Sequence, residues 1–215
     1  YALAVPVGLS ALVVLPGQRF DHESHETPYL SRLWNALAGG PFVFLLGCVF
    51  LVFVLKYGFV HTALPFLIND LHGLESGGIG LAIGTMALSA AALASVHGRL
   101  ERHFSRPTLI RTGLVSYGAG LFCSTIGEHV GLLMGGIVLA GIGHGLLLPA
   151  VNTAIVGLAD RQLRASTMSI RKIFVRGGQT IGSPLLAWTG QSWGYATTVT
   201  ITGAAVAAFA FLLVL

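Results

Sequence analysis

Charged residues are scarce in this chain. They make up 9% of its 215 residues, whereas hydrophobic residues make up 54%. A soluble domain carries about 25% charged residues. Together with a mean hydropathy of +0.80, this scarcity excludes an ordinary soluble domain and predicts an integral membrane protein.

Disulfides, metal sites and a signal peptide are not indicated either. The two cysteines, Cys48 and Cys123, both fall in apolar stretches, so no disulfide framework is implied. His22 and His25 lie among acidic residues but lack a diagnostic metal-binding spacing. Residues 1–16 are apolar without the basic residues of a signal peptide. We expect them to be the end of a transmembrane helix that begins further upstream.

Six apolar stretches follow that suit membrane-spanning helices. They cover roughly residues 41–68, 77–97, 108–126, 130–158, 166–188 and 195–215. A polar linker, residues 17–40, precedes them and ends in a short amphipathic segment suited to the membrane surface. We therefore predict an all-α membrane protein with a six-transmembrane-helix bundle over residues 41–215.

The basic residues predict the orientation of these helices. Ten of the twelve lysines and arginines fall in the linker and in the loops around residues 98–111 and 159–172, and the alternate loops contain none. Because basic loops remain in the cytoplasm, we expect these segments and the C-terminus to be cytoplasmic, in a plasma membrane. The expected contact of the basic loops is anionic lipid rather than nucleic acid.

The fifth stretch carries the most informative pattern. Four polar side chains recur there at helical spacing and share one side of the helix: Lys172, Arg176, Gln179 and Ser183. Gly178 and Gly182 suit close packing against another helix, as do Gly80 and Gly84 in the second stretch. Since a charge at membrane depth is costly unless it faces water or a partner, we predict that the fifth helix lines a wet cavity. The alternative is that Lys172 reaches the interface and Arg176 belongs to a structural ion pair.

Two histidines and one lysine are further candidates within the apolar stretches. Lys56 and Arg176 are the two basic residues that lie outside the predicted cytoplasmic segments. Lys56 lies about 22 Å along the first stretch if that stretch is an α-helix. A lysine there can carry a proton or hold an anionic group. His61 lies one turn beyond Tyr57, and such a lone histidine is more often a packing residue.

His144 lies among three glycines, which leave room for a neighbouring helix or a ligand. Asn152 follows Pro149 and can supply a hydrogen bond where the proline kinks the helix. The six stretches contain no carboxylate. The predicted substrate or proton pathway therefore consists of Lys56, Tyr57, His61, His144, Asn152, Arg176, Gln179 and Ser183.

The loop Gly98-Arg99-Leu100-Glu101-Arg102-His103-Phe104-Ser105-Arg106-Pro107 resembles the signature loop of the major facilitator superfamily, Gly-x-Leu-x-Asp-Arg-x-Gly-Arg-Arg. Gly98, Leu100 and Arg106 match the pattern, whereas Arg102 stands in place of the aspartate. In the family, that aspartate latches the inside gate by pairing with a helix end. The resemblance implies a cytoplasmic gate formed by Gly98, Arg99, Leu100, Glu101 and Arg106, with Glu101 as the substitute for the aspartate.

Three further segments, residues 56–68, 141–164 and 177–188, resemble the seventh, tenth and eleventh helices of that family. The resemblance covers residues 41–215 and is closest to prokaryotic multidrug-efflux drug/proton antiporters. It implies the C-terminal half of a twelve-helix fold, whose partner is a missing N-terminal half. It also implies a secondary active transporter, not an enzyme, that exports small amphipathic molecules by alternating access. The energy source would be the proton gradient, with no cofactor.

Other functions stay open from the sequence. The cations Lys56 and Arg176 suit proton-coupled uptake or facilitated transport of an anionic metabolite. A remote alternative is an intramembrane enzyme built on His61 and His144, although no nucleophile motif accompanies them. A non-transporting receptor is the last alternative.

Overall fold

The computed structural model describes residues 39–73, 76–127, 129–159 and 162–212, and every regular element in them is a helix. The elements are α3 (Gly40–Gly58), η1 (Phe59–Ala63), α4 (Leu64–His72), α5 (Ser76–Leu100), α6 (Arg106–Cys123), α7 (Val130–Leu158), α8 (Arg164–Trp193) and α9 (Tyr195–Leu212). Because α3, η1 and α4 are continuous, these elements form six helical rods within the described residues. The rods coincide with the six predicted stretches, with shifts of a few residues at their ends.

Length and apolar composition single out some of these rods as membrane spans. Among the described residues, three helices qualify alone: Gly40–Asn69, Ser76–Leu100 and Val130–Leu158. The helices α8 and α9 meet at a bend of 119° and make a fourth span if the pair is counted as one. The four basic residues in the first half of α8 lower its hydropathy. The apolar helices agree with an integral membrane protein, and the prediction of six separate spans stays a prediction.

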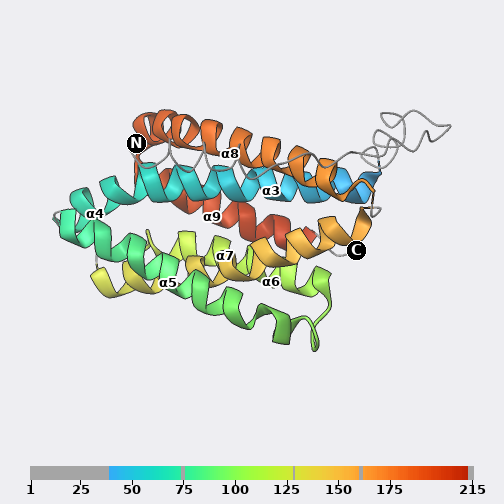
Figure 1. Cartoon of the computed structure of the whole chain (residues 1–215). Helices are drawn as coiled ribbons and strands as arrows, with labels where there is room; N and C mark the ends of the chain where they lie inside the picture. The colour runs from blue at the N-terminus through green and yellow to red at the C-terminus, as the bar shows by residue number, and fades with distance from the viewer. Residues whose placement is uncertain (1–38, 74–75, 128, 160–161, 213–215) are drawn as a thin grey trace, which may run out of the picture. The chain divides into compact units, whose positions relative to one another are not determined.

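The helices associate in two groups. The first is a pair, because α3 lies side by side with α8 (Figure 1). In the second, α6 packs against α7 and α9, and α7 also packs against α5. Large apolar side chains such as Phe59, Tyr117 and Ile137 are almost completely buried between these helices. All of these helices belong to one unit, Asn35–Leu215.

Two glycines of α8 explain its close approach to α3. A Cβ atom added at Gly178 would lie 2.6 Å from the Phe50 carbonyl oxygen, and one added at Gly182 would lie 2.5 Å from the Val54 carbonyl oxygen. The two backbones therefore touch, as the spacing of this glycine pair predicts. At Gly80 and Gly84 nothing in the described chain lies within 4 Å of an added Cβ atom, so the described helices do not use this pair and its role in close packing stays a prediction.

The first rod changes its helical register in the middle. Phe59–Ala63 forms a π-helical turn between α3 and α4, and Pro65 lies in the first turn of α4. Proline has no backbone N–H, so the regular hydrogen bond to the carbonyl four residues earlier cannot form. The Ser183 hydroxyl of α8 donates to the Tyr57 carbonyl at 3.2 Å, directly before this turn. A side chain of the neighbouring helix α8 thus donates a hydrogen bond to the backbone close to the point where the hydrogen-bond pattern changes from α-helical to π-helical.

The predicted helix end at residues 1–16 and most of the linker at 17–40 lie outside the described residues. The predicted surface segment and both linker histidines fall in this part of the chain. The functional residues proposed within the helices all lie in the part that the structure describes.

Candidate functional site

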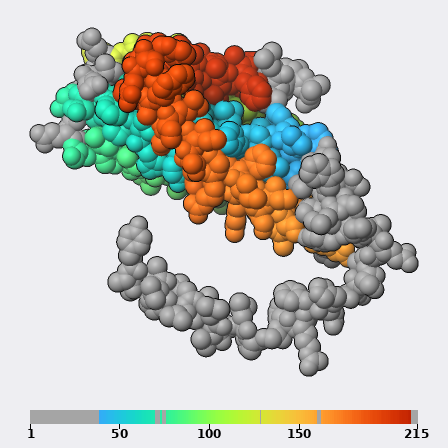
Figure 2. Space-filling view, turned by 90° about the horizontal axis from the view of Figure 1, so that it is seen from above, coloured from blue at the N-terminus to red at the C-terminus, as the bar shows by residue number. Residues whose placement is uncertain are grey.

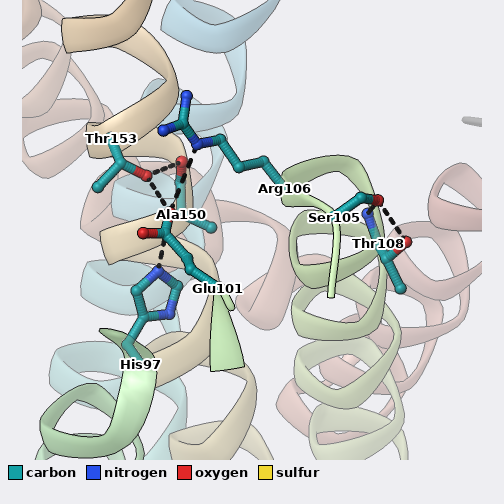
Figure 3. Close-up of polar contacts among 7 residues, drawn as sticks. All are labelled: His97, Glu101, Ser105, Arg106, Thr108, Ala150 and Thr153. Carbon is teal, nitrogen blue, oxygen red and sulfur yellow. Dashed lines mark hydrogen bonds and ion pairs between the residues drawn. The ribbon is translucent and has the colours of Figure 1, made fainter. Parts of the chain in front are cut away.

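Glu101 is the centre of a polar cluster between α5, α6 and α7 (Figure 3). The Thr153 hydroxyl of α7 donates to Glu101 Oε1 at 2.7 Å. His97 Nε2 and Arg106 Nε each lie 3.6 Å from the same oxygen. We call these four residues the Glu101 cluster. It connects the loop after α5 to the start of α6 and to the last third of α7.

The local sequence explains how the loop delivers this carboxylate. The Glu101 N–H donates to the His97 carbonyl at 2.9 Å, so Glu101 continues the helical path of α5 and stays one turn beyond His97. Ser105 then caps α6, because its Oγ accepts from the Thr108 N–H at 3.4 Å. Pro107 fits the first turn, where its missing N–H would have no intrahelical partner. A tight turn therefore places Glu101 and Arg106 on the same side of α7.

The cluster favours the ionised form of Glu101. The Thr153 hydrogen bond is the main cause that lowers the pKa of this carboxyl, and the charges of His97 and Arg106 act in the same direction. His97 is buried, with 5% of its surface exposed, whereas Arg106 is exposed. The cluster is thus a charge-assisted contact that is partly shielded from solvent.

The structure places the other residues of the predicted gate around this cluster. Gly98 and Arg99 are exposed at the end of α5, and Leu100 is half-buried. Arg102, at the position of the family's aspartate, is exposed. The neighbouring Glu101 makes the contact to α7 instead. Sequence reasoning missed His97 and Thr153, although the spacing of four residues between His97 and Glu101 on a helix was a usable signal.

Three predicted pathway residues lie where α3 passes into η1: Lys56 and Tyr57 near the end of α3, and His61 in η1. Lys56 and Tyr57 are half-buried and His61 is exposed. The centroid of the Tyr57 ring lies 4.8 Å from the centroid of the His61 ring and 6.5 Å from the centroid of the Phe53 ring. His61 is therefore a partner in an aromatic row, as expected from its spacing to Tyr57. No carboxylate of the described residues lies within ion-pair distance of Lys56.

His144 of α7 is buried, with 7% of its surface exposed. The centroid of its ring lies 6.2 Å from the centroid of the Tyr117 ring of α6. Nδ1 of His144, the Tyr117 hydroxyl and Oδ1 of Asn152 are buried without a hydrogen-bond partner in the described chain. Buried polar atoms of this kind are unusual and mark a strained or functional position.

Neighbouring helices pack directly against the glycines around His144. A Cβ atom at Gly143 would collide with the Tyr117 backbone, and one at Gly145 would collide with the Ala90 backbone. At Gly141 it would collide with the Ser89 side chain. Of the two uses that the sequence left open for these glycines, close helix packing is the one observed.

The polar stripe of α8 is present on one side of the helix. Arg176 Nη1 donates to the Gln179 side-chain oxygen at 3.0 Å. Lys172 and Arg176 are exposed, Gln179 and Ser183 are half-buried, and Ser183 binds the α3 backbone. Figure 2 shows α8, in orange, along the viewed face of the molecule, where α3 does not cover it.

The polar residues described above therefore form three groups in the structure. They are the Glu101 cluster, the Lys56 region with His144, and the stripe on α8. Ser183 bridges the last two through Tyr57. Among the described residues, no single enclosed site contains all eight predicted pathway residues.

Comparison with known proteins identifies the family of the chain. No curated protein matches the chain closely. The family model of the Major Facilitator Superfamily matches residues 45–215, which is well over half of the chain and contains all three polar groups. Members of this family are transporters, and the chain belongs to the major facilitator superfamily.

Proposed function

We propose that this secondary transporter exports small amphipathic or drug-like molecules in exchange for protons. The observation that carries the proposal is the position of Lys56. It lies near the middle of the apolar span Gly40–Asn69, half-buried, with no carboxylate of the described residues within ion-pair distance. A charge in such a place is costly and is kept where it serves a pathway.

In this mechanism Lys56 and His144 exchange the proton, while Arg176 and Gln179 line the cavity that holds the substrate. Tyr57, His61 and Asn152 complete its wall, and Ser183 supports the wall from α8 by its hydrogen bond to the Tyr57 carbonyl. The Glu101 cluster acts as the cytoplasmic gate: it holds the loop before α6 against α7 while that side is closed, and it opens when the helices rock. The described helices act together with a second six-helix half, which supplies the opposite wall.

Transport in liposomes tests the proposal. The full natural protein is reconstituted, a pH gradient is imposed, and the movement of a lipophilic fluorescent cation is followed. We expect Lys56→Ala to abolish pH-driven transport while the protein remains folded. Lys172→Ala is the matched control, because Lys172 is exposed near the basic end of α8. Unchanged transport by Lys56→Ala would remove the proposed role of Lys56.

A second candidate is proton-coupled uptake or facilitated transport of an anionic metabolite, which Lys56 and Arg176 would attract. Accumulation of a substrate in inverted vesicles supports export, and accumulation in intact cells supports uptake. A further measurement, the intact mass of the protein from its source, tests the twelve-helix arrangement. A mass about twice the 22.5 kDa of this chain agrees with a second half on the same polypeptide.

A further inference from the structure

A pocket outside the proposed substrate pathway lies beside the Glu101 cluster and shares Arg106 with it. Its volume is about 740 Å³, and it is bounded by the first turn of α3, the first turns of α6 and the last turns of α7. Phe44, Leu45, Ile110 and Leu158 form much of its apolar wall. Two arginines, Arg106 and Arg111, also line it. The pocket is therefore apolar in its walls and cationic at one side.

The positive charge of this pocket is only partly compensated. Arg106 has Glu101 as a neighbour at 3.6 Å, and its Nη1 lies close to the backbone at Gly157. The Arg111 guanidinium lies 5.6 Å from the centre of the Phe211 ring of α9. Among the described residues, no carboxylate is within ion-pair distance of Arg111. The aromatic contact holds the guanidinium in place but leaves its charge for an anion.

The position of the pocket indicates which kind of anion it would bind. It lies at one end of two apolar spans, because the span that contains α3 begins at Gly40 and the α7 span finishes at Leu158. This level of a membrane protein meets the headgroup region of the bilayer. A guanidinium matches the oxygens of a phosphate in a bidentate geometry. An apolar wall next to it favours burial of hydrocarbon.

We infer that this pocket binds an anionic phospholipid. Its phosphodiester would lie at Arg106 and Arg111, and an acyl chain would cover the wall formed by α3 and α6. Basic pockets between membrane helices are suited to such headgroups. The inference depends on the membrane location of the family and not on the direction of transport or on proton coupling. Its failure would leave the proposed function unaffected.

Native mass spectrometry of the full natural protein tests the lipid site. The detergent-purified protein is titrated with phosphatidylglycerol and, separately, with phosphatidylcholine of the same acyl chains. We expect phosphatidylglycerol to bind more tightly, and Arg111→Gln to weaken it about tenfold, as for loss of one charge-assisted contact. Arg102→Gln is the matched control, since this exposed arginine lies in the loop before α6 and does not line the pocket. It should bind like the natural protein.

A second variant tests the pocket without changing a charge. Ala154→Trp, on the α7 side, would fill part of the cavity and should also weaken phosphatidylglycerol binding. An unchanged affinity for Ala154→Trp, or equal losses for Arg111→Gln and Arg102→Gln, would overturn the inference. Displacement of the lipid by inorganic phosphate at millimolar concentration would also overturn it, because the site would then hold a free anion rather than a lipid.

Discussion

The Thr153 hydroxyl donates a 2.7 Å hydrogen bond to the Glu101 carboxylate, although 52 residues separate the two in the sequence. The same hydroxyl lies 3.1 Å from the Ala150 carbonyl of its own helix. Thr153 is therefore positioned by α7 and reaches out to the loop between α5 and α6. This pair is the shortest polar link between that loop and α7 among the residues described.

Thr153→Val tests the strength of this link. Valine keeps the shape of threonine but removes the donor, so Glu101 loses its closest hydrogen bond. We expect the free energy of unfolding to fall by about 1.5–3 kcal/mol, as for a hydrogen bond to a charged group. Titration with sodium dodecyl sulfate in mixed micelles measures the change. Thr189→Val is the control, because that hydroxyl binds only carbonyls of its own helix. Similar losses in both variants would contradict the special role of Thr153.

The charge of Glu101 predicts a pH dependence. Because its pKa is held below the usual value of about 4.3, the ionised carboxylate stabilises the fold fully above that value. This contribution is lost as the pH falls below it, through the lowered pKa. We expect Glu101→Gln to be less stable than the natural protein at pH 7, and the difference to shrink as the pH falls below about 4.3.

The neighbours of Glu101 define the control for this experiment. His97 and Arg106 face the carboxylate, and the charges of both act on it. The comparison is therefore repeated in a His97→Gln background. A stability difference that persists unchanged at pH 3 in that background would show that the carboxylate charge is not the cause.

The contact between α3 and α8 predicts different effects on stability when Gly177 and Gly182, two glycines of α8, are replaced by alanine. Gly182→Ala places a Cβ atom 2.5 Å from the Val54 carbonyl oxygen, so the helices must separate. We expect a loss of about 1–3 kcal/mol, as for overpacking. At Gly177 the nearest atom would lie 3.4 Å away on the Phe50 ring. Gly177→Ala should be neutral or slightly stabilising, because alanine favours a helix. Equal losses at both sites would contradict the observed packing.

Ser183→Ala separates support of the backbone from contact with substrate. Its hydroxyl donates to the Tyr57 carbonyl at 3.2 Å, so we expect a loss of about 0.5–1.5 kcal/mol in stability. Ser192→Ala is the control, since Ser192 is exposed and binds only its own helix. Transport by Ser183→Ala at saturating substrate should persist. Lost transport with unchanged stability would instead assign Ser183 to the pathway.

Much of the helical arrangement was predictable from apolar stretches and turn residues. The rod Val130–Leu158 has the predicted bounds. The longer basic regions were less predictable, because helices continue into them. The helix α6 begins at Arg106 and α8 begins at Arg164, so each extends about two residues further into a basic segment than the predicted stretch. Helical hydrogen bonding and long arginine side chains let a helix extend beyond its apolar part.

The sites were predictable only where a sequence pattern marks them. The gate loop was found by its resemblance to a family signature, and Glu101 was noted there as a substitute. Thr153 belongs to a distant helix, so its role depends on tertiary packing that no local pattern records. Likewise, the glycine pair Gly80 and Gly84 has the same spacing as Gly178 and Gly182 but no neighbour in the described chain. Spacing shows that a helix can approach closely, and the fold decides whether one does.

The backbone contact between α3 and α8 has a mechanical consequence. Gly178 and Gly182 rest on the carbonyls of Phe50 and Val54, and Ser183 holds the carbonyl of Tyr57. These three points lie along successive turns, so sliding of one helix against the other would break all of them at once. We therefore expect α3 and α8 to move as one rigid body, so that a displacement at the level of Lys56 also moves the exposed cations of α8.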